Sequence, residues 1–127
     1  MCDVTGAAVL DVPIDQSAPA LARRFLRDSL CKVHAPLRLE DAELLVSELV
    51  TNGLKFGAPP IMLRVECEGD NGLRVHVRDA SLAVPTPRSP EITEEGGRGL
   101  LLVDYISNDW GVSPLSDGKE VWFRLRD

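Results

Sequence analysis

Three polar side chains, Glu48, Asn52 and Lys55, interrupt the amphipathic stretch "ELVTNGLKFG" at residues 48–57. A helix advances by about 100° per residue, so side chains four and seven positions apart share one narrow stripe. This stripe borders the apolar stripe of the same helix, and a ligand could lie along it. An acid, an amide and a lysine placed there could bind a charged ligand. Taken alone, the pattern is more typical of a solvated core edge.

A second group of candidates lies at residues 95–103, where "EGGRGLLLV" combines three glycines with Arg98. Glycines that open a helix let backbone N–H groups and the helix dipole face an anion, and the missing Cβ atoms let a phosphate come close. A hinge before the helix explains the glycines alone equally well. The stretch is neither a P-loop nor a Rossmann fingerprint, because GxxxxGK[ST] does not occur and the glycines follow a loop.

Asp79 ends the predicted strand "LRVHVRD" and precedes a long loop. A carboxylate at a strand end can accept a hydrogen bond from the amino group of a ligand. Aspartate is also a common turn residue, so this position is weak evidence by itself.

The remaining pattern indicates the elements that must position these residues. We expect a strand at 7–14, a helix at 15–33 with Ser17 as its N-cap, and a helix at about 39–57. Strands at 61–69 and 73–80 alternate apolar and polar residues and form a hairpin. A long loop at 81–97, with three prolines and several acids, is typical of a lid or of disorder.

The chain resumes with a short apolar helix at 98–107 and ends in a hairpin that turns at "SDGK". Trp110, Trp122 and Phe123 are expected to add bulk to the core. Helices early and strands late predict an α+β fold, with helices on one face of a mostly antiparallel sheet. A length of 127 residues predicts one domain over residues 1–127.

Composition excludes several classes of function. The net charge of −6 argues against a nucleic-acid partner, since Lys and Arg provide most of the affinity for phosphate backbones. No apolar run approaches the roughly 18 residues of a membrane span, and the N-terminus lacks the basic start of a signal peptide, so we expect a cytoplasmic protein with no membrane partner. Cys2, Cys31 and Cys67 have the spacing of neither a zinc site nor a disulfide framework.

The order of these features along the chain resembles the pattern of a known family. The features are E-x-x-x-N on a helix, a strand-end Asp, a lid, and G-x-G-L at the opening of a helix. The family is the histidine-kinase-like ATPase superfamily, the Bergerat or GHKL fold of gyrase-type topoisomerases, heat-shock chaperones, histidine kinases and mismatch-repair proteins. "SELVTNGLKFG" and "GGRGLLLVD" look most like the stand-alone anti-sigma factor serine kinases of actinobacteria. The resemblance covers roughly residues 7–126 and implies a two-layer α/β sandwich with a mostly antiparallel mixed sheet and an ATP lid at about 81–97.

The resemblance also implies roles for individual residues. Asn52 would coordinate the Mg²⁺ that bridges the ATP phosphates, and Glu48 would act as the general base. Lys55 matches a position that contacts phosphate in some relatives, and Asp79 would accept a hydrogen bond from the adenine amino group. The phosphates would approach the backbone at Gly97, Arg98, Gly99 and Leu100.

The sequence departs from the family pattern in two places. Family members usually carry a glycine two residues after the strand-end Asp, and this chain has Ser81. Some kinases place an arginine just ahead of the glycines, where this chain has Glu94 and Glu95. Arg98 could substitute for that arginine.

Two functions follow from the resemblance. The first is an ATP-binding, Mg-dependent anti-sigma factor with serine/threonine kinase activity. It would transfer the γ-phosphate to a Ser/Thr of an anti-anti-sigma (STAS-type) partner, whose unphosphorylated form frees a sigma factor. The alternative is a regulatory module that binds nucleotide or sequesters a partner without phosphotransfer. The family also suggests a homodimer.

Overall fold

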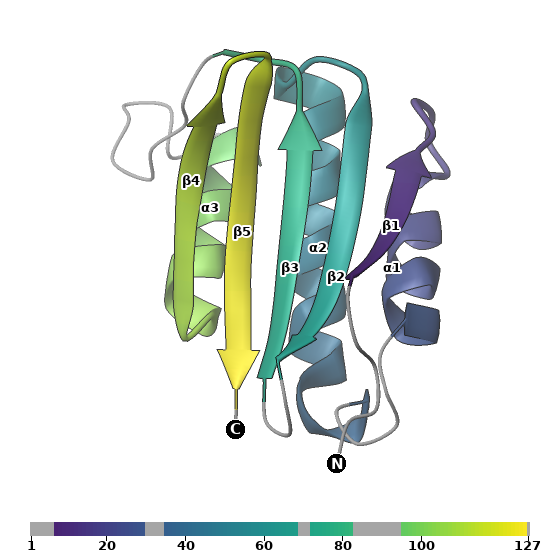
Figure 1. Cartoon of the computed structure of the whole chain (residues 1–127), viewed down its shortest axis with the longest axis vertical. Helices are drawn as coiled ribbons and strands as arrows, with labels where there is room; N and C mark the ends of the chain where they lie inside the picture. Colours follow the sequence, from purple (N-terminus) through teal and green to yellow (C-terminus); the bar gives the residue numbers. More distant parts are fainter. Residues whose placement is uncertain (1–6, 30–34, 69–71, 83–94, 127) are drawn as a thin grey trace.

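Three helices and five strands make up the part of the chain that the structure describes (Figure 1). The computed structural model describes residues 7–29, 35–68, 72–82 and 95–126. The elements in chain order are β1 (Ala7–Val12), α1 (Ala18–Ser29), α2 (Ala35–Phe56), β2 (Ile61–Glu68), β3 (Gly72–Asp79), α3 (Glu95–Ile106), β4 (Asp109–Leu115) and β5 (Gly118–Arg126). The predicted order of helices and strands is confirmed. The predicted lid at 81–97 falls mostly outside the described residues.

The strands form one open sheet in the order β1-β2-β3-β5-β4. All of its neighbouring pairs are antiparallel, and the helices lie on one face (Figure 1). The predicted two-layer α+β sandwich is therefore confirmed, but the expectation of a mixed sheet is wrong. After β3 the chain returns through α3 and the β4–β5 hairpin, so that β5 enters beside β3 in the opposite direction.

The core lies between the sheet and the helices, and the period of two along each strand selects its members. On β3, Val75 and Val77 face the helices, whereas Arg74 and Arg78 face the open side of the sheet and are half-buried. The largest fully buried side chains are Leu26, Leu45, Val46, Val50, Ile61, Leu63, Val75, Val103, Phe123 and Leu125. The predicted alternation of the two middle strands is thus confirmed.

Trp122 does not belong to this core, contrary to the sequence-based expectation. Phe123 pairs with Val75 on the helix side, so its neighbour Trp122 must point to the open face. There the guanidinium carbon of Arg74 lies 5.0 Å from the centroid of the indole ring, a cation–π contact. Trp110 is half-buried against the core, and its indole N–H donates to Asp104 of α3 over 2.8 Å.

Two of the helices begin earlier than the sequence predicts. Helix α2 begins at Ala35, because a kink at Arg38 (φ −130°, ψ 27°) joins a short segment to the helix predicted from about residue 39. Helix α3 begins at Glu95, so the three glycines lie within its first turns. None of the described helices has both the length and the apolar character needed to cross a membrane.

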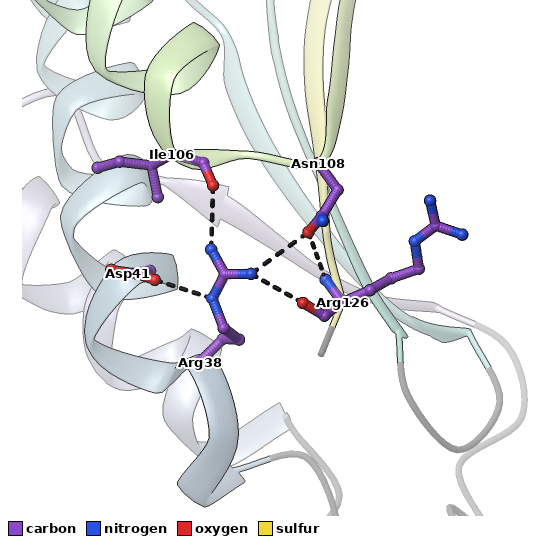
Figure 2. Close-up of polar contacts among 5 residues, drawn as sticks. All are labelled: Arg38, Asp41, Ile106, Asn108 and Arg126. Atoms are coloured by element: carbon purple, nitrogen blue, oxygen red, sulfur yellow. Dashed lines mark hydrogen bonds and ion pairs between the residues drawn. The ribbon is translucent and has the colours of Figure 1, made fainter.

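Arg38, at the kink, ties three elements together (Figure 2). Its guanidinium donates to the carbonyl of Ile106 over 3.0 Å, to the carbonyl of Arg126 over 2.8 Å and to the side chain of Asn108 over 3.3 Å. Its Nε also donates to Asp41 over 2.8 Å. Ile106 ends α3, where helical carbonyls have no partner within the helix, so Arg38 caps α3 and binds the end of β5.

This arrangement predicts that Arg38→Lys lowers the free energy of unfolding by about 1–3 kcal/mol, because an ammonium cannot make the same fork of bonds in a half-buried place. Urea unfolding followed by circular dichroism measures the change. The matched control is Arg24→Lys on the exposed side of α1, expected to stay within about 0.5 kcal/mol of wild type. Equal losses in both variants would contradict a clamping role for Arg38.

Candidate functional site

The candidate residues come from three elements, α2, β3 and α3, which meet the start of β5 at one end of the sheet. The C-terminal ends of α2 and β3, the start of α3 and the start of β5 all lie at the top in Figure 1. Glu48, Asn52 and Lys55 belong to the last turns of α2, and Asp79 is the last residue of β3. The stretch from Gly97 to Leu100 lies in the first turns of α3.

Asn52 on α2 lies directly against Gly99 on α3. A Cβ atom built on Gly99 would be 2.5 Å from Asn52 Nδ2 and 3.5 Å from its Oδ1, closer in the first case than real Cβ atoms come to other atoms. Only glycine therefore fits at this position with Asn52 where it is. The Asn52 amide consequently reaches the first turns of α3, near the unsatisfied N–H groups of a helix N-terminus.

The other two polar residues of α2 lie one turn to either side of Asn52. Glu48 and Asn52 are half-buried, whereas Lys55 is exposed. Core residues such as Leu49 and Val50 flank them on the same helix. The polar stripe thus follows the edge of the core on the side that approaches α3.

Asp79 is buried, and its carboxylate is engaged from two sides. The backbone N–H of Ser81 donates to Asp79 Oδ1 over 2.7 Å. The ammonium of Lys119 lies 3.0 Å from Oδ1 and 3.0 Å from Oδ2. Asp79 and Lys119 are only 6% and 7% exposed, so this ion pair is removed from water.

Two glycines fix the position of Asp79. A Cβ on Gly57 would lie 2.8 Å from the Asp79 carboxyl carbon, and a Cβ on Gly118 would lie 2.0 Å from the Asp79 carbonyl oxygen. The N–H of Ala80 also donates to the carbonyl of Ala58 over 2.8 Å, which joins the segment just after α2 to the residue just after β3. The carboxylate is therefore held by backbone as well as by charge.

Lys119 was not among the residues that the sequence pointed to, although a signal was present. Positions 119, 121, 123 and 125 have the same parity on β5, and the last three are core residues. A lysine in phase with a core stripe is unusual, because ammonium groups are rarely buried without a partner. The identity of the partner could not be read from the sequence, since Asp79 lies 40 residues away.

The remaining candidates lie in the first turns of α3. Leu100 is 2% exposed and its side chain belongs to the core, which leaves its backbone for any ligand contact. Gly97 and Arg98 lie in the first turn of α3, and the side chain of Arg98 is outside the described residues. Glu94 and the rest of residues 83–94 are also outside them.

The donor set fits a magnesium nucleotide better than a metal held by protein alone. Among the described residues, no group of three or more His, Cys, Asp or Glu could hold a metal ion. Asn52 offers one hard oxygen ligand, and Mg²⁺ typically takes one or two protein ligands and completes its shell with phosphates and water. Glycine at position 99 lets that amide pack against the start of α3, since a Cβ there would lie 2.5 Å from Asn52 Nδ2.

Residues 12–125 match the sequence profile of the histidine kinase-like ATPase domain. The match covers most of the chain, so the chain belongs to this family. Membership implies ATP as its ligand. Among curated proteins, none matches the sequence closely enough to be counted as a relative.

Solved structures share the fold. The RsbU and RsbW domains of Rv1364c from Mycobacterium tuberculosis match with a TM-score of 0.70 at 19% identity, over 96% of this chain and 32% of that one. The histidine kinase domain of a blue-light activated histidine kinase from Erythrobacter litoralis matches with a TM-score of 0.55 at 22% identity, over 77% and 46% of the two chains. This chain therefore spans only 32% of the first structure's length.

The contact between α2 and α3 predicts that Gly99→Ala weakens Mg-ATP binding at least ten-fold, because the new Cβ must displace either the Asn52 amide or the start of α3. Alanine is the better helix former by about 1 kcal/mol, so helix propensity alone would favour the variant. Isothermal titration calorimetry measures the affinity. Leu101→Ala, at an exposed position two residues further along α3, is the control. Unchanged affinity in Gly99→Ala would contradict a role for this contact in binding.

Proposed function

We propose that the chain is an anti-sigma factor kinase that binds Mg-ATP between Asn52 and the start of α3. It transfers the γ-phosphate to a Ser/Thr hydroxyl of an anti-anti-sigma, STAS-type partner protein. The observation that carries the proposal is the contact of Asn52 with Gly99, which joins the two halves of the family motif. The fold match to a structure that contains an RsbW domain supports this choice within the family.

Each candidate residue has a defined part in this reaction. Asn52 donates its side-chain oxygen to the magnesium ion, and the first N–H groups of α3 face the phosphates. Lys55, exposed at the last turn of α2, supplies a positive charge for the phosphate groups. Asp79 faces the adenine base of the nucleotide. Bound Mg-ATP would supply the phosphoryl group, and its Mg²⁺ would neutralise part of the phosphate charge. Phosphoryl transfer then depends mainly on alignment.

Glu48 lies one helical turn before Asn52 and is half-buried at the same helix edge. It takes the proton from the partner's hydroxyl while the hydroxyl oxygen bonds to the γ-phosphorus and the bond to the β–γ bridging oxygen breaks. The products are ADP and a phosphorylated partner. Because the partner is a protein and the site is at one end of the sheet, the partner must dock at that end.

A second candidate function is a module that sequesters a partner and has weak or no phosphotransfer. The buried pair of Asp79 with Lys119 favours this second function, because the carboxylate that is proposed to bind adenine already binds the Lys119 ammonium. Calorimetry with Mg-ATP and a radiolabel transfer assay separate the two functions. Binding without transfer to any STAS-type protein would support the second. In either case we propose a cytoplasmic protein that forms homodimers.

Kinase chemistry predicts that substitutions of Asn52 and Glu48 affect nucleotide binding and phosphate transfer differently. Asn52→Ala should abolish measurable Mg-ATP binding, because it removes the metal ligand. Glu48→Gln should leave the Kd for Mg-ATP within about three-fold and lower the rate of transfer by roughly 10²–10⁴, the usual contribution of a general base. The measurements are calorimetry and transfer of radiolabel from ATP to the partner.

The control is Glu40→Gln, an exposed glutamate two turns earlier on α2, which should change neither quantity. If Asn52→Ala binds Mg-ATP as wild type does, the site assignment is wrong. If Glu48→Gln transfers phosphate at the wild-type rate, Glu48 is not the base.

A further inference from the structure

Lys119 and Asp79 form a cross-strand pair at the inner face of the sheet, at the same end as Asn52 and Gly99. Their Cα atoms are direct partners in the ladder between β3 and β5. Both side chains point to the helix side, as the burial of Val77 and Val121 on the same face shows. A charge pair thus occupies the last core-facing position before the candidate site.

The hydrogen-bonding capacity of this pair is partly used. A carboxylate has about four acceptor positions, and Asp79 uses three of them for the Ser81 N–H and for the two contacts of the ammonium. An ammonium has three donors, and Lys119 directs its charge at the two carboxylate oxygens. These contacts leave about one acceptor position on Asp79 and one donor on Lys119.

Stability alone does not explain a charge pair at this position. Replacing a buried ion pair with well-packed apolar residues is often neutral or stabilising, because both charges must lose their hydration. Apolar residues fill the equivalent places further along β5, at Val121, Phe123 and Leu125. A donor retained beside the carboxylate points to recognition of a ligand group.

We propose that Lys119 is a specificity-determining residue that lets the site accept 6-oxo purine triphosphates as well as 6-amino ones. This inference rests on the proposed function, in which Asp79 faces the base. A lone carboxylate accepts the 6-amino group of adenine and repels a 6-oxo group. With the Lys119 ammonium beside it, a 6-oxo group finds a donor, and the 6-amino group must share the carboxylate with Lys119.

The test compares ATP with inosine triphosphate, which carries a 6-oxo group in place of the 6-amino group. Calorimetry on the full chain with Mg²⁺ gives the ratio of the two Kd values. We expect this ratio, inosine triphosphate over ATP, to be below about ten for wild type. Lys119→Met removes the donor at similar side-chain length and should raise the ratio at least ten-fold, roughly the value of one hydrogen bond to a charged group.

The ratio is a suitable readout because a general loss of stability affects both nucleotides equally. Arg124→Lys, on the open face of the same strand, should leave the ratio unchanged. If Lys119→Met does not fold, Lys119→Val provides the same comparison, because it also lacks a donor and suits a β-strand. Wild type also tests the inference without any variant, since a ratio above about one hundred would overturn it.

The outcomes separate this inference from the proposed function. If wild type binds neither nucleotide, the proposed function fails and the inference fails with it. If wild type binds ATP but the lysine variant leaves the ratio unchanged, only the role of Lys119 is wrong. A raised ratio in the variant with weak discrimination in wild type supports both.

Discussion

The close approach of α3 to α2 at Gly99 is the contact on which the candidate site depends. Glycine within a helix costs about 1 kcal/mol relative to alanine, so propensity does not explain it. Space does, because a Cβ on Gly99 would lie 2.5 Å from the Asn52 amide nitrogen. With the Cβ absent, a side chain from one helix reaches the N-terminal turns of another, where partial positive charge gathers. The Asn52 amide and the N-terminal turns of α3 therefore lie next to each other.

A second constraint fixes the other half of the site, at the end of β3. Gly57 and Gly118 approach Asp79 from α2 and β5, and the Ser81 N–H and the Lys119 ammonium occupy its carboxylate. The Ser81 N–H and the Lys119 ammonium hold the carboxylate in one orientation, and the missing Cβ of Gly57 leaves room for it beside the end of α2. Asp79 is therefore preorganised, as its proposed contact with the adenine of a nucleotide requires.

The sequence predicted the layers of the fold because their signals are periodic and local. The alternation of Leu63 and Val65 on β2 and the helical spacing of Leu45 and Leu49 are visible without a structure. Features set by contacts distant in sequence were not predicted. Arg38, at the kink of α2, binds carbonyls that are 68 and 88 residues away. Trp122 was assigned to the core on size, whereas the strand register places it on the open face.

The two ends of α3 are held to α2 in different ways, and this asymmetry suits the proposed chemistry. At its C-terminal end, Arg38 binds the carbonyl of Ile106 through a charged hydrogen bond of 3.0 Å. At its N-terminal end, Gly99 and Asn52 meet by close packing. Phosphoryl transfer depends on alignment more than on bond chemistry in the protein. A helix whose far end is clamped by charge can present its first N–H groups in a fixed direction, and its near end is packed against the Asn52 amide.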